Sequence, residues 1–393
     1  MDLFAWLSTG AAALVVVAAA VLRGAAFATF AAVLLAIHTL ISIALVEYFS
    51  GVLPVYAYLQ AAVYLHFGLL ARARLRSRPF RALVSLPASW FVAGTFLAFP
   101  WAIAAGLGFT PRGAFLPYAI ALVGMLQSLW HQPEEIDITL DGAAVDSLRR
   151  HGRGEVRVER PLRIVQITDP HLGPFMSEAR LRGVCERAAA RDPDLVLLTG
   201  DFLTMESHGD PGPLARALGP LAALKGRVFA CRGNHDLEAP ATVARALDAI
   251  GARLLIDDAA VVETPAGPVQ LVGMDFRFRD KKAPMAEVCA RHPRLPGVLR
   301  LVLLHDPGAF QHLPEGEGDL VLSGHTHGGQ LGLLSLGLPH TIVSALGVMP
   351  DHGLWARGQD RLYVHRGTGH YGFPVRLGVP AEESLLRVHV TRA

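Results

Sequence analysis

Acidic, amide and imidazole side chains follow five short apolar runs in the C-terminal half of the chain. The runs cover residues 162–168, 195–199, 228–231, 299–304 and 320–322. The side chains that follow them are Asp169, His171, Asp201, Asn234, His235, Asp236, His305, His325 and His327. Carboxylate and imidazole groups bind divalent metals, and unrelated polar turns would not repeat so few residue types. The pattern therefore predicts a metal site.

The mixture of ligands indicates which metals the site would take. Imidazole and carboxylate together suit manganese, iron or zinc better than magnesium alone, which prefers oxygen ligands. Two such ions, roughly 3.5–4 Å apart, can hold a bridging hydroxide and clamp a phosphoryl group during in-line displacement. One ligand must bridge the pair, and carboxylates do this well. Gly200, Gly233 and Gly324 stand beside the ligands, where they permit sharp turns and close backbone approach.

The apolar runs are predicted to be the strands that position these ligands. Helical patterns at 178–191 and 241–250 separate some of them. Strands that alternate with helices indicate a layered α/β domain, in which ligands collect beyond the carboxyl ends of the strands. We therefore expect the polar side chains to meet at one edge of the domain.

The ordered set of motifs resembles that of the calcineurin-like metallophosphoesterases. The motifs are Asp169-x-His171, Gly200-Asp201, Gly233-Asn234-His235-Asp236, His305 and Gly324-His325-Thr326-His327. The resemblance runs from residue 162 to the C-terminus and implies an α/β sandwich of two sheets with flanking helices. Segments 323–330 and 367–386 look more narrowly like the membrane-associated bacterial branch. That branch includes phosphodiesterases, and some related enzymes cleave the pyrophosphate of UDP-diacylglucosamine.

The resemblance also implies a role for each position. The first metal would be held by Asp169, His171 and His327, and the second by Asn234, His305 and His325. Asp201 would bridge the two ions. His235 would protonate the leaving oxygen or stabilise the phosphoryl charge, and Asp236 would orient His235. Pro170 departs from the family pattern, where an aliphatic residue is more usual, and should stiffen the turn without removing a ligand.

The first 133 residues have a different composition. Their only acids are Asp2 and Glu47, and they contain no lysine. A membrane-crossing helix needs about 20 apolar residues. Four segments meet or approach that length, at 3–22, 27–46, 55–70 and 86–108, the last with an expected kink at Pro100; a fifth, shorter candidate covers 115–130. These segments predict a multi-span helical domain whose partner is the lipid bilayer.

The arginines indicate which side of the membrane one loop of this domain faces. Arg72, Arg74, Arg76, Arg78 and Arg81 lie between two apolar spans, and basic loops face the cytoplasm. If 115–130 crosses the bilayer, the C-terminal half also lies in the cytoplasm, beneath a bacterial plasma membrane. If it does not, that half lies outside. The three cysteines show no disulfide or metal spacing, which favours a reducing compartment.

Other features are given ordinary structural interpretations. Basic and acidic residues nearly cancel, 36 against 34, so no nucleic-acid partner is expected. His38 and His66 each stand alone in their spans and are predicted to pack between helices. The remaining loop residues of interest are placed outside the site; they are His208, His352, His370 and Tyr371.

The chain is thus divided into a transmembrane domain (1–133), a connection with a possible edge strand (134–160) and a metallophosphoesterase domain (161–393). The predicted function is hydrolysis of a phosphodiester or pyrophosphate bond, in a substrate that membrane attachment would allow to be lipid-linked, by attack of a metal-bridging hydroxide. One alternative is a phosphomonoesterase. Another is a receptor that keeps the metal fold only as a binding module, which the intact ligand set and His235 disfavour.

Overall fold

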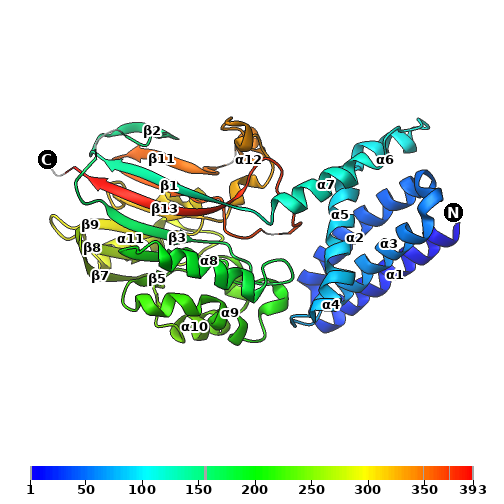
Figure 1. Ribbon diagram of the computed structural model, residues 1–393, viewed down its shortest axis with the longest axis horizontal. Coiled ribbons are helices and arrows are strands. Elements are labelled where there is room, and N and C mark those ends of the chain that lie inside the picture. Colours follow the sequence, from blue (N-terminus) through cyan, green and yellow to red (C-terminus); the bar gives the residue numbers. More distant parts are fainter. Residues whose placement is uncertain (1, 155–156, 348, 371, 392–393) are drawn as a thin grey trace.

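The computed structural model describes residues 2–154, 157–347, 349–370 and 372–391. A bundle of helices forms one end of the molecule and a two-sheet sandwich forms the other (Figure 1). Tyr371, one of the loop residues considered above, lies outside the described residues.

The helical end is built from long apolar segments. Its elements are α1 (Asp2–Leu22), α2 (Ala25–Leu45), η1 (Val46–Val52), α3 (Leu53–Leu70), α4 (Arg78–Phe80), η2 (Arg81–Ser85), α5 (Leu86–Leu97), α6 (Phe99–Gly106) and α7 (Leu116–Gln127). Within the described residues, three stretches are long and apolar enough to cross a membrane: Leu3–Leu22, Ala25–Leu70 and Arg78–Leu97. The second, of 46 residues, contains both α2 and α3.

Two predicted spans differ from the helices observed. The segment predicted at 86–108 is divided at Ala98, because Pro100 lies in the first turn of α6 and disfavours a continuous helix before it. The apolar stretch of spanning length is instead Arg78–Leu97. The segment at 115–130 forms only α7, whose 12 residues extend about 18 Å at 1.5 Å per residue. That is shorter than a hydrocarbon core of about 30 Å.

Polar side chains join α2 to α3 inside the bundle. His38 Nε2 lies 3.1 Å from Gln60 Oε1, and Thr39 Oγ1 lies 2.7 Å from the Tyr64 hydroxyl. Both histidines of the bundle are buried, as expected for helix-packing residues, although His66 also borders a cavity described below. A buried imidazole that has a hydrogen-bond partner avoids the cost of an unpaired polar group in an apolar environment.

The sandwich contains the five predicted strands. Among the described residues, the first sheet has six strands in the order β1 (His131–Leu140), β13 (Ala381–Val390), β3 (Leu162–Ile167), β4 (Leu195–Leu198), β5 (Val228–Ala230) and β6 (Arg253–Leu254). The second has seven in the order β2 (Val145–Arg150), β11 (Gly353–Gly358), β12 (Asp360–Val364), β10 (Leu320–Ser323), β9 (Leu299–Leu303), β8 (Gly267–Gly273) and β7 (Asp258–Thr264). This is the predicted α/β sandwich of two sheets.

The order of parallel strands brings the ligand-bearing ends together. β3, β4, β5 and β6 pair in parallel in the first sheet, as do β8, β9, β10 and β12 in the second. Ile164 and Leu197 of one sheet pack against Leu301 and Leu322 of the other in a shared apolar core. All five predicted strands therefore run the same way within their sheets and end at one side of the sandwich.

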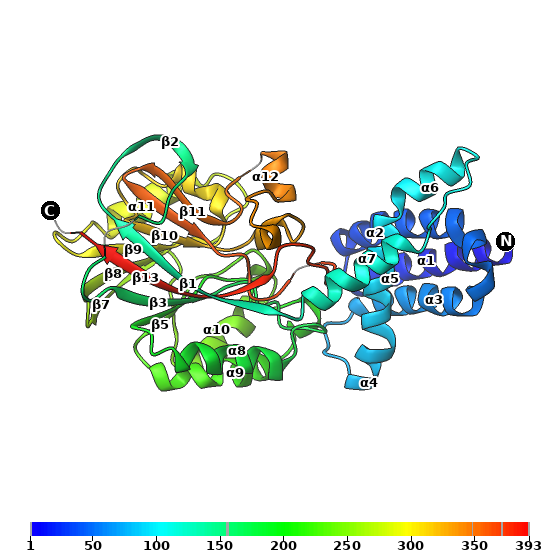
Figure 2. The same cartoon turned by 45° about the horizontal axis from the view of Figure 1, so that its top comes forward.

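Helices cover the outer faces of both sheets (Figures 1 and 2). The first sheet packs on α8 (Glu178–Ala190), α9 (Gly212–Leu218) and α10 (Pro240–Asp248). The second packs on α11 (Lys282–Arg291). The predicted connecting segment supplies β1 and β2, which are edge strands of the two sheets.

The two ends of the molecule meet through α7 and the C-terminal tail. The Arg376 N–H donates to the Gly124 carbonyl (3.0 Å), and the Gly378 N–H donates to Gln127 Oε1 (3.0 Å). Arg180 of α8 donates to the Ser128 carbonyl at 2.6 Å. These contacts place the sandwich directly against the bundle.

Candidate metal centre

The predicted ligands converge at the carboxyl ends of the strands. Two groups of side chains each have ligand atoms within 4.8 Å of one another: Asp169, His171 and His327, and Asp201, His305 and His325. Every member except His325 is buried. Two ligands of one ion lie up to about 4 Å apart, twice a typical metal–ligand bond, which is within about 1 Å of the spacing in these groups. Both groups are therefore compact enough to hold one ion each.

Asp201 lies between the two groups. Its Oδ2 is 3.7 Å from His171 Nε2 in the first group and 3.3 Å from His305 Nε2 in the second. Asp169 Oδ1 is 3.4 Å from His327 Nε2 and 3.9 Å from His305 Nε2. The carboxylates thus connect the imidazoles into one cluster, because each approaches imidazoles of both groups.

The remaining predicted residues lie in the turn after β5. The His235 N–H donates to Asp201 Oδ1 at 2.9 Å, and the rings of His235 and His171 lie 5.4 Å apart between centroids. Asn234 precedes His235, and among the described atoms its buried Oδ1 has no hydrogen-bond partner. A buried amide oxygen without a partner is costly in an ordinary turn and suits a metal ligand.

Asp236 has a different set of contacts from the one predicted. Its carboxylate accepts hydrogen bonds from the N–H groups of Asp201 (2.8 Å), Phe202 (2.9 Å) and Gly233 (2.8 Å). It therefore ties the turn after β4 to the turn after β5. Glu238 is the carboxylate beside the imidazole, since its Oε1 lies 3.4 Å from His235 Nδ1. One turn of 3₁₀ helix, η5 (His235–Glu238), brings these two side chains together.

The surroundings set the charges of these groups. Burial lowers the pKa of His171 to about 3, so its imidazole is neutral, as a metal ligand must be. Burial and the charge of Asp201 raise the pKa of Asp236 to about 7. Burial lowers the pKa of His235, but the hydrogen bond to Glu238 and the charge of Asp201 outweigh burial and raise it above the usual value.

Backbone strain is concentrated at the cluster. Among the described residues, nine non-glycine residues have positive φ, and five of them are predicted ligands: Asp169 (52°), His171 (46°), Asp201 (56°), His325 (69°) and His327 (51°). The left-handed region costs roughly 1–2 kcal/mol for a residue with a side chain. Strained backbone tends to persist at functional sites, where the surrounding fold determines it.

Three residues near the cluster were not predicted to take part. Glu238 is one, and Arg376 is another: its buried guanidinium donates to the Arg366 carbonyl at 2.8 Å and lies 3.4 Å from His327 Nδ1. The third, His370, is buried, and its ring is tilted against that of Phe175 with the centroids 5.2 Å apart. The glycine-rich stretch 367–372 was the signal that this segment can approach the site, and Gly369 N–H indeed donates to the Asp169 carbonyl at 2.9 Å.

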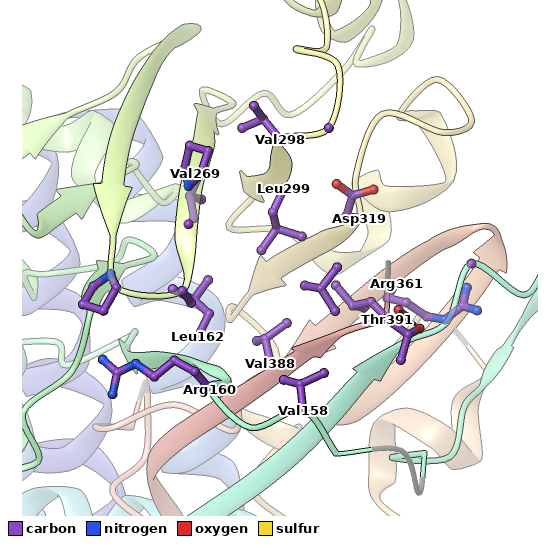
Figure 3. A pocket seen from close by; sticks show the side chains of 18 of the residues that line it. Val158, Arg160, Leu162, Val269, Val298, Leu299, Asp319, Arg361, Val388 and Thr391 are labelled. Carbon is purple, nitrogen blue, oxygen red and sulfur yellow. Dashed lines mark hydrogen bonds between the residues drawn. The ribbon is translucent and has the colours of Figure 1, made fainter. Parts of the chain in front are cut away.

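Two further histidines lie where they were expected, outside the cluster. His352 contacts Arg150 and Asp351, and His208 lies 3.9 Å from Glu238 Oε2. A cavity of about 810 Å³ also lies elsewhere, lined by Leu162 and Leu299 at the amino ends of β3 and β9 (Figure 3). None of the predicted ligands borders this cavity, so it is separate from the cluster.

Gly233→Ala should disrupt the cluster, because a methyl group there would collide with Asp201 Oδ1. We expect the variant to retain its fold and lose most of its bound manganese, measured by metal analysis of purified protein. Gly152→Ala is the matched control, since a methyl group at that position meets no atom within 4 Å. Full metal content in Gly233→Ala would contradict the arrangement of Asp201 described here.

Comparisons with known proteins agree with this geometry. The profile of the calcineurin-like phosphoesterases matches residues 162–329. Phosphodiesterase YaeI of Escherichia coli K12 is 31% identical over 233 residues, which cover 58% of this chain and 82% of YaeI. The UDP-2,3-diacylglucosamine pyrophosphatase LpxG of Chlamydia muridarum is 28% identical over 278 residues, covering 58% of this chain and 83% of LpxG.

A third relative is described by both a membrane part and a catalytic part. A zebrafish (Danio rerio) protein described as a transmembrane protein with a metallophosphoesterase domain is 29% identical over 239 residues, covering 56% of this chain and 52% of that protein. The matched family profile, the relatives and the cluster of ligands agree on one chemistry. This chain belongs to the calcineurin-like phosphoesterase family and is a metal-dependent phosphoric ester hydrolase.

Proposed function

We propose that this protein is a membrane-anchored phosphodiesterase that binds two divalent metal ions and hydrolyses a phosphodiester or pyrophosphate bond. The observation that carries the proposal is the position of Asp201, whose Oδ2 lies 3.7 Å and 3.3 Å from imidazoles of the two ligand groups. YaeI is named a phosphodiesterase and LpxG a pyrophosphatase of a diacylated sugar nucleotide, which favours a diester and makes a lipid-linked substrate our leading candidate.

The residues present fit the two ions. Asp169, His171 and His327 would hold the first, and Asn234, His305 and His325 the second, with Asp201 shared. Manganese, iron and zinc all suit this donor set. When bound, such a pair supplies a water-derived nucleophile and neutralises charge on the phosphoryl oxygens. Asp236 would keep Asp201 in place through the backbone contacts of both turns.

His235 is proposed to act on the leaving oxygen. Its imidazole is largely buried beside His171 and contacts Glu238, which helps to keep it protonated. A protonated imidazole at this position would donate its proton to the oxygen that departs from phosphorus. Glu238, rather than Asp236, would orient the ring.

Contacts between the two ends of the molecule support a proposal for the side of the membrane on which the catalytic domain lies. Arg23 Nη1 donates to the Leu70 carbonyl at 2.7 Å, and its Nη2 lies 3.6 Å from Glu238 Oε2 of the sandwich. The arginine-rich segment 72–81 starts at the same end of α3. Basic residues mark the cytoplasmic end of a bundle. We therefore propose that the catalytic domain lies in the cytoplasm, below the plasma membrane, and that the short α7 segment returns the chain to this side by local thinning of the bilayer.

The function is tested by turnover with added manganese. We expect the protein to hydrolyse bis(p-nitrophenyl) phosphate faster than p-nitrophenyl phosphate, and Asp201→Asn to lose metal from both sites together with activity. Asp192→Asn is the control, because Asp192 also has a positive φ (46°) and its side chain is exposed. A preference for the monoester would favour a phosphatase, and an inactive metal-loaded protein would favour a binding module.

His235→Ala should retain both metals and lose turnover. General acid catalysis is typically worth about 10²–10⁴-fold, and the loss should shrink for nitrophenol, which leaves readily without a proton. The measurement compares kcat for substrates whose leaving groups differ in pKa. His208→Ala is the control, since His208 approaches the same Glu238 carboxylate. An equal loss for all leaving groups would show that His235 stabilises charge instead.

Sidedness is tested by labelling introduced cysteines in intact cells, in a background without the native thiols. Glu315→Cys, exposed in the catalytic domain, should resist a membrane-impermeant maleimide until the cells are lysed. Gly51→Cys, in η1 at the opposite end of α3, should react before lysis. Reaction at position 315 in intact cells would place the catalytic domain outside and leave the metal assignment intact.

A further inference from the structure

A cavity of about 220 Å³ lies between the bundle and the sandwich. Leu34 of α2, Phe67 of α3 and Val92 of α5 form one wall. The catalytic domain supplies the other wall through Phe175, Met205 and Phe373. Both walls are chiefly apolar, so the cavity would favour a hydrocarbon ligand.

One end of the cavity reaches the metal cluster at His171. His171 borders the cavity, and its Nε2 lies 3.2 Å from Nε2 of His327 in the first ligand group. His370 and Phe175 stand beside it, with ring centroids 5.2 Å apart. A molecule whose phosphorus lies at the cluster could therefore extend an attached chain into the cavity.

The other end approaches the lipid-facing side of α2. Phe30 borders the cavity and is 43% exposed. Val33, three residues further along α2, is 57% exposed and is not part of the cavity lining. Phe30 lies five residues after the start of α2 at Ala25, or about 7.5 Å along the helix. If α2 crosses the bilayer, this depth corresponds to the region just below the headgroups, where lipid chains begin.

We propose that this cavity holds one acyl or alkyl chain of the substrate, so that the helical bundle is part of the substrate-binding site as well as an anchor. The inference rests on the proposed function and adds to it the place where the hydrocarbon chain of a lipid-linked phosphodiester or pyrophosphate would bind. The chain would enter past Phe30, lie against Leu34, and end at the phosphate beside His171. The isolated catalytic domain would lack half of this cavity.

The test uses the purified full chain with manganese and a series of p-nitrophenyl alkyl phosphates, from ethyl to octyl. In each hydrolysis, the oxygen of water bonds to phosphorus, the bond to nitrophenolate breaks, and an alkyl phosphate remains. Burial of one methylene is worth about 0.8 kcal/mol, which corresponds to about fourfold in kcat/KM for each methylene that enters the cavity. We expect kcat/KM to increase with chain length until the cavity is filled.

Leu34→Trp should fill the cavity, abolish this increase and lower kcat/KM for the octyl ester at least tenfold relative to the unmodified protein. The readout is the ratio of kcat/KM for the octyl ester to that for the ethyl ester, and the manganese content of the purified variant shows that it is folded. Val33→Trp is the matched control, because it adds the same side chain to the lipid-facing side of α2 and changes detergent contacts equally. Leu34→Ala should move the plateau to longer chains, whereas Val33→Ala should not.

The outcomes separate the inference from the proposed function. No turnover of the ethyl ester by the unmodified, metal-loaded protein would refute the function itself. Normal turnover of that ester, with the same dependence on chain length in the Leu34 and Val33 variants, would overturn the inference alone. If Leu34→Trp also loses turnover of the ethyl ester, Leu34→Ala is the deciding variant. A plateau in kcat/KM at an unchanged chain length overturns the inference, and a plateau at a longer chain length supports it.

Discussion

The burial of two carboxylates in one place is the constraint on which the catalytic half depends. Asp169 and Asp201 are 0% and 2% exposed, and both approach the same imidazoles. Ionised carboxylates are costly in an apolar interior unless cations or hydrogen-bond donors surround them. Burial raises the pKa of Asp201, yet the charge of His305 and its hydrogen bond to the carboxylate outweigh burial and lower it below the usual range. The surrounding side chains thus favour two anions, which is the charge that a pair of divalent metals requires.

Backbone geometry satisfies the same constraint. N–H groups of His325 and His235 donate to Asp169 and Asp201 at 3.0 Å and 2.9 Å. These donors can reach the carboxylates because Gly233 and Gly324 have no side chain to collide with them. The left-handed ligands are held in place by a sandwich core, in which residues such as Leu197 and Leu322 are fully buried. A stable core can maintain local strain that an isolated turn could not.

Hydrogen bonds and an ion pair, in addition to the polypeptide chain itself, connect the helical bundle to this site. Arg376 shows the connection best, since its N–H donates to the Gly124 carbonyl of α7 while its buried guanidinium lies beside His327. Burial lowers the pKa of Arg376 to about 9, but the carboxylates of Asp169 and Glu382 oppose that effect and favour its charged form. Arg23 makes a second connection to Glu238, the neighbour of His235. A shift of the bundle would therefore change the surroundings of both His327 and His235.

The sequence by itself determined the fold class, the two-sheet architecture and which side chains cluster, except for the partner of His235. Each ligand follows directly after a strand, so local order in the sequence specifies its place once the strands pair in parallel. The roles of Asn234 and Asp201 as ligands stay predictions, as does the division of the chain at residues 133 and 160. The family resemblance implied that Asp236 orients His235, whereas its carboxylate accepts hydrogen bonds from the N–H groups of Asp201, Phe202 and Gly233.

Only the tertiary structure decided the features that depend on segments far apart in the chain. Glu238 contacts both His235 and Arg23, and the cavity brings Leu34 opposite Phe175 and Phe373. The apolar pattern of α2 shows that Leu34 and Val33 both suit a membrane, but not which of them faces the catalytic domain. The length of α7 was likewise set by packing against α5 and the tail. Such choices depend on how whole elements pack, because the hydrophobic effect is not directional and does not specify a partner.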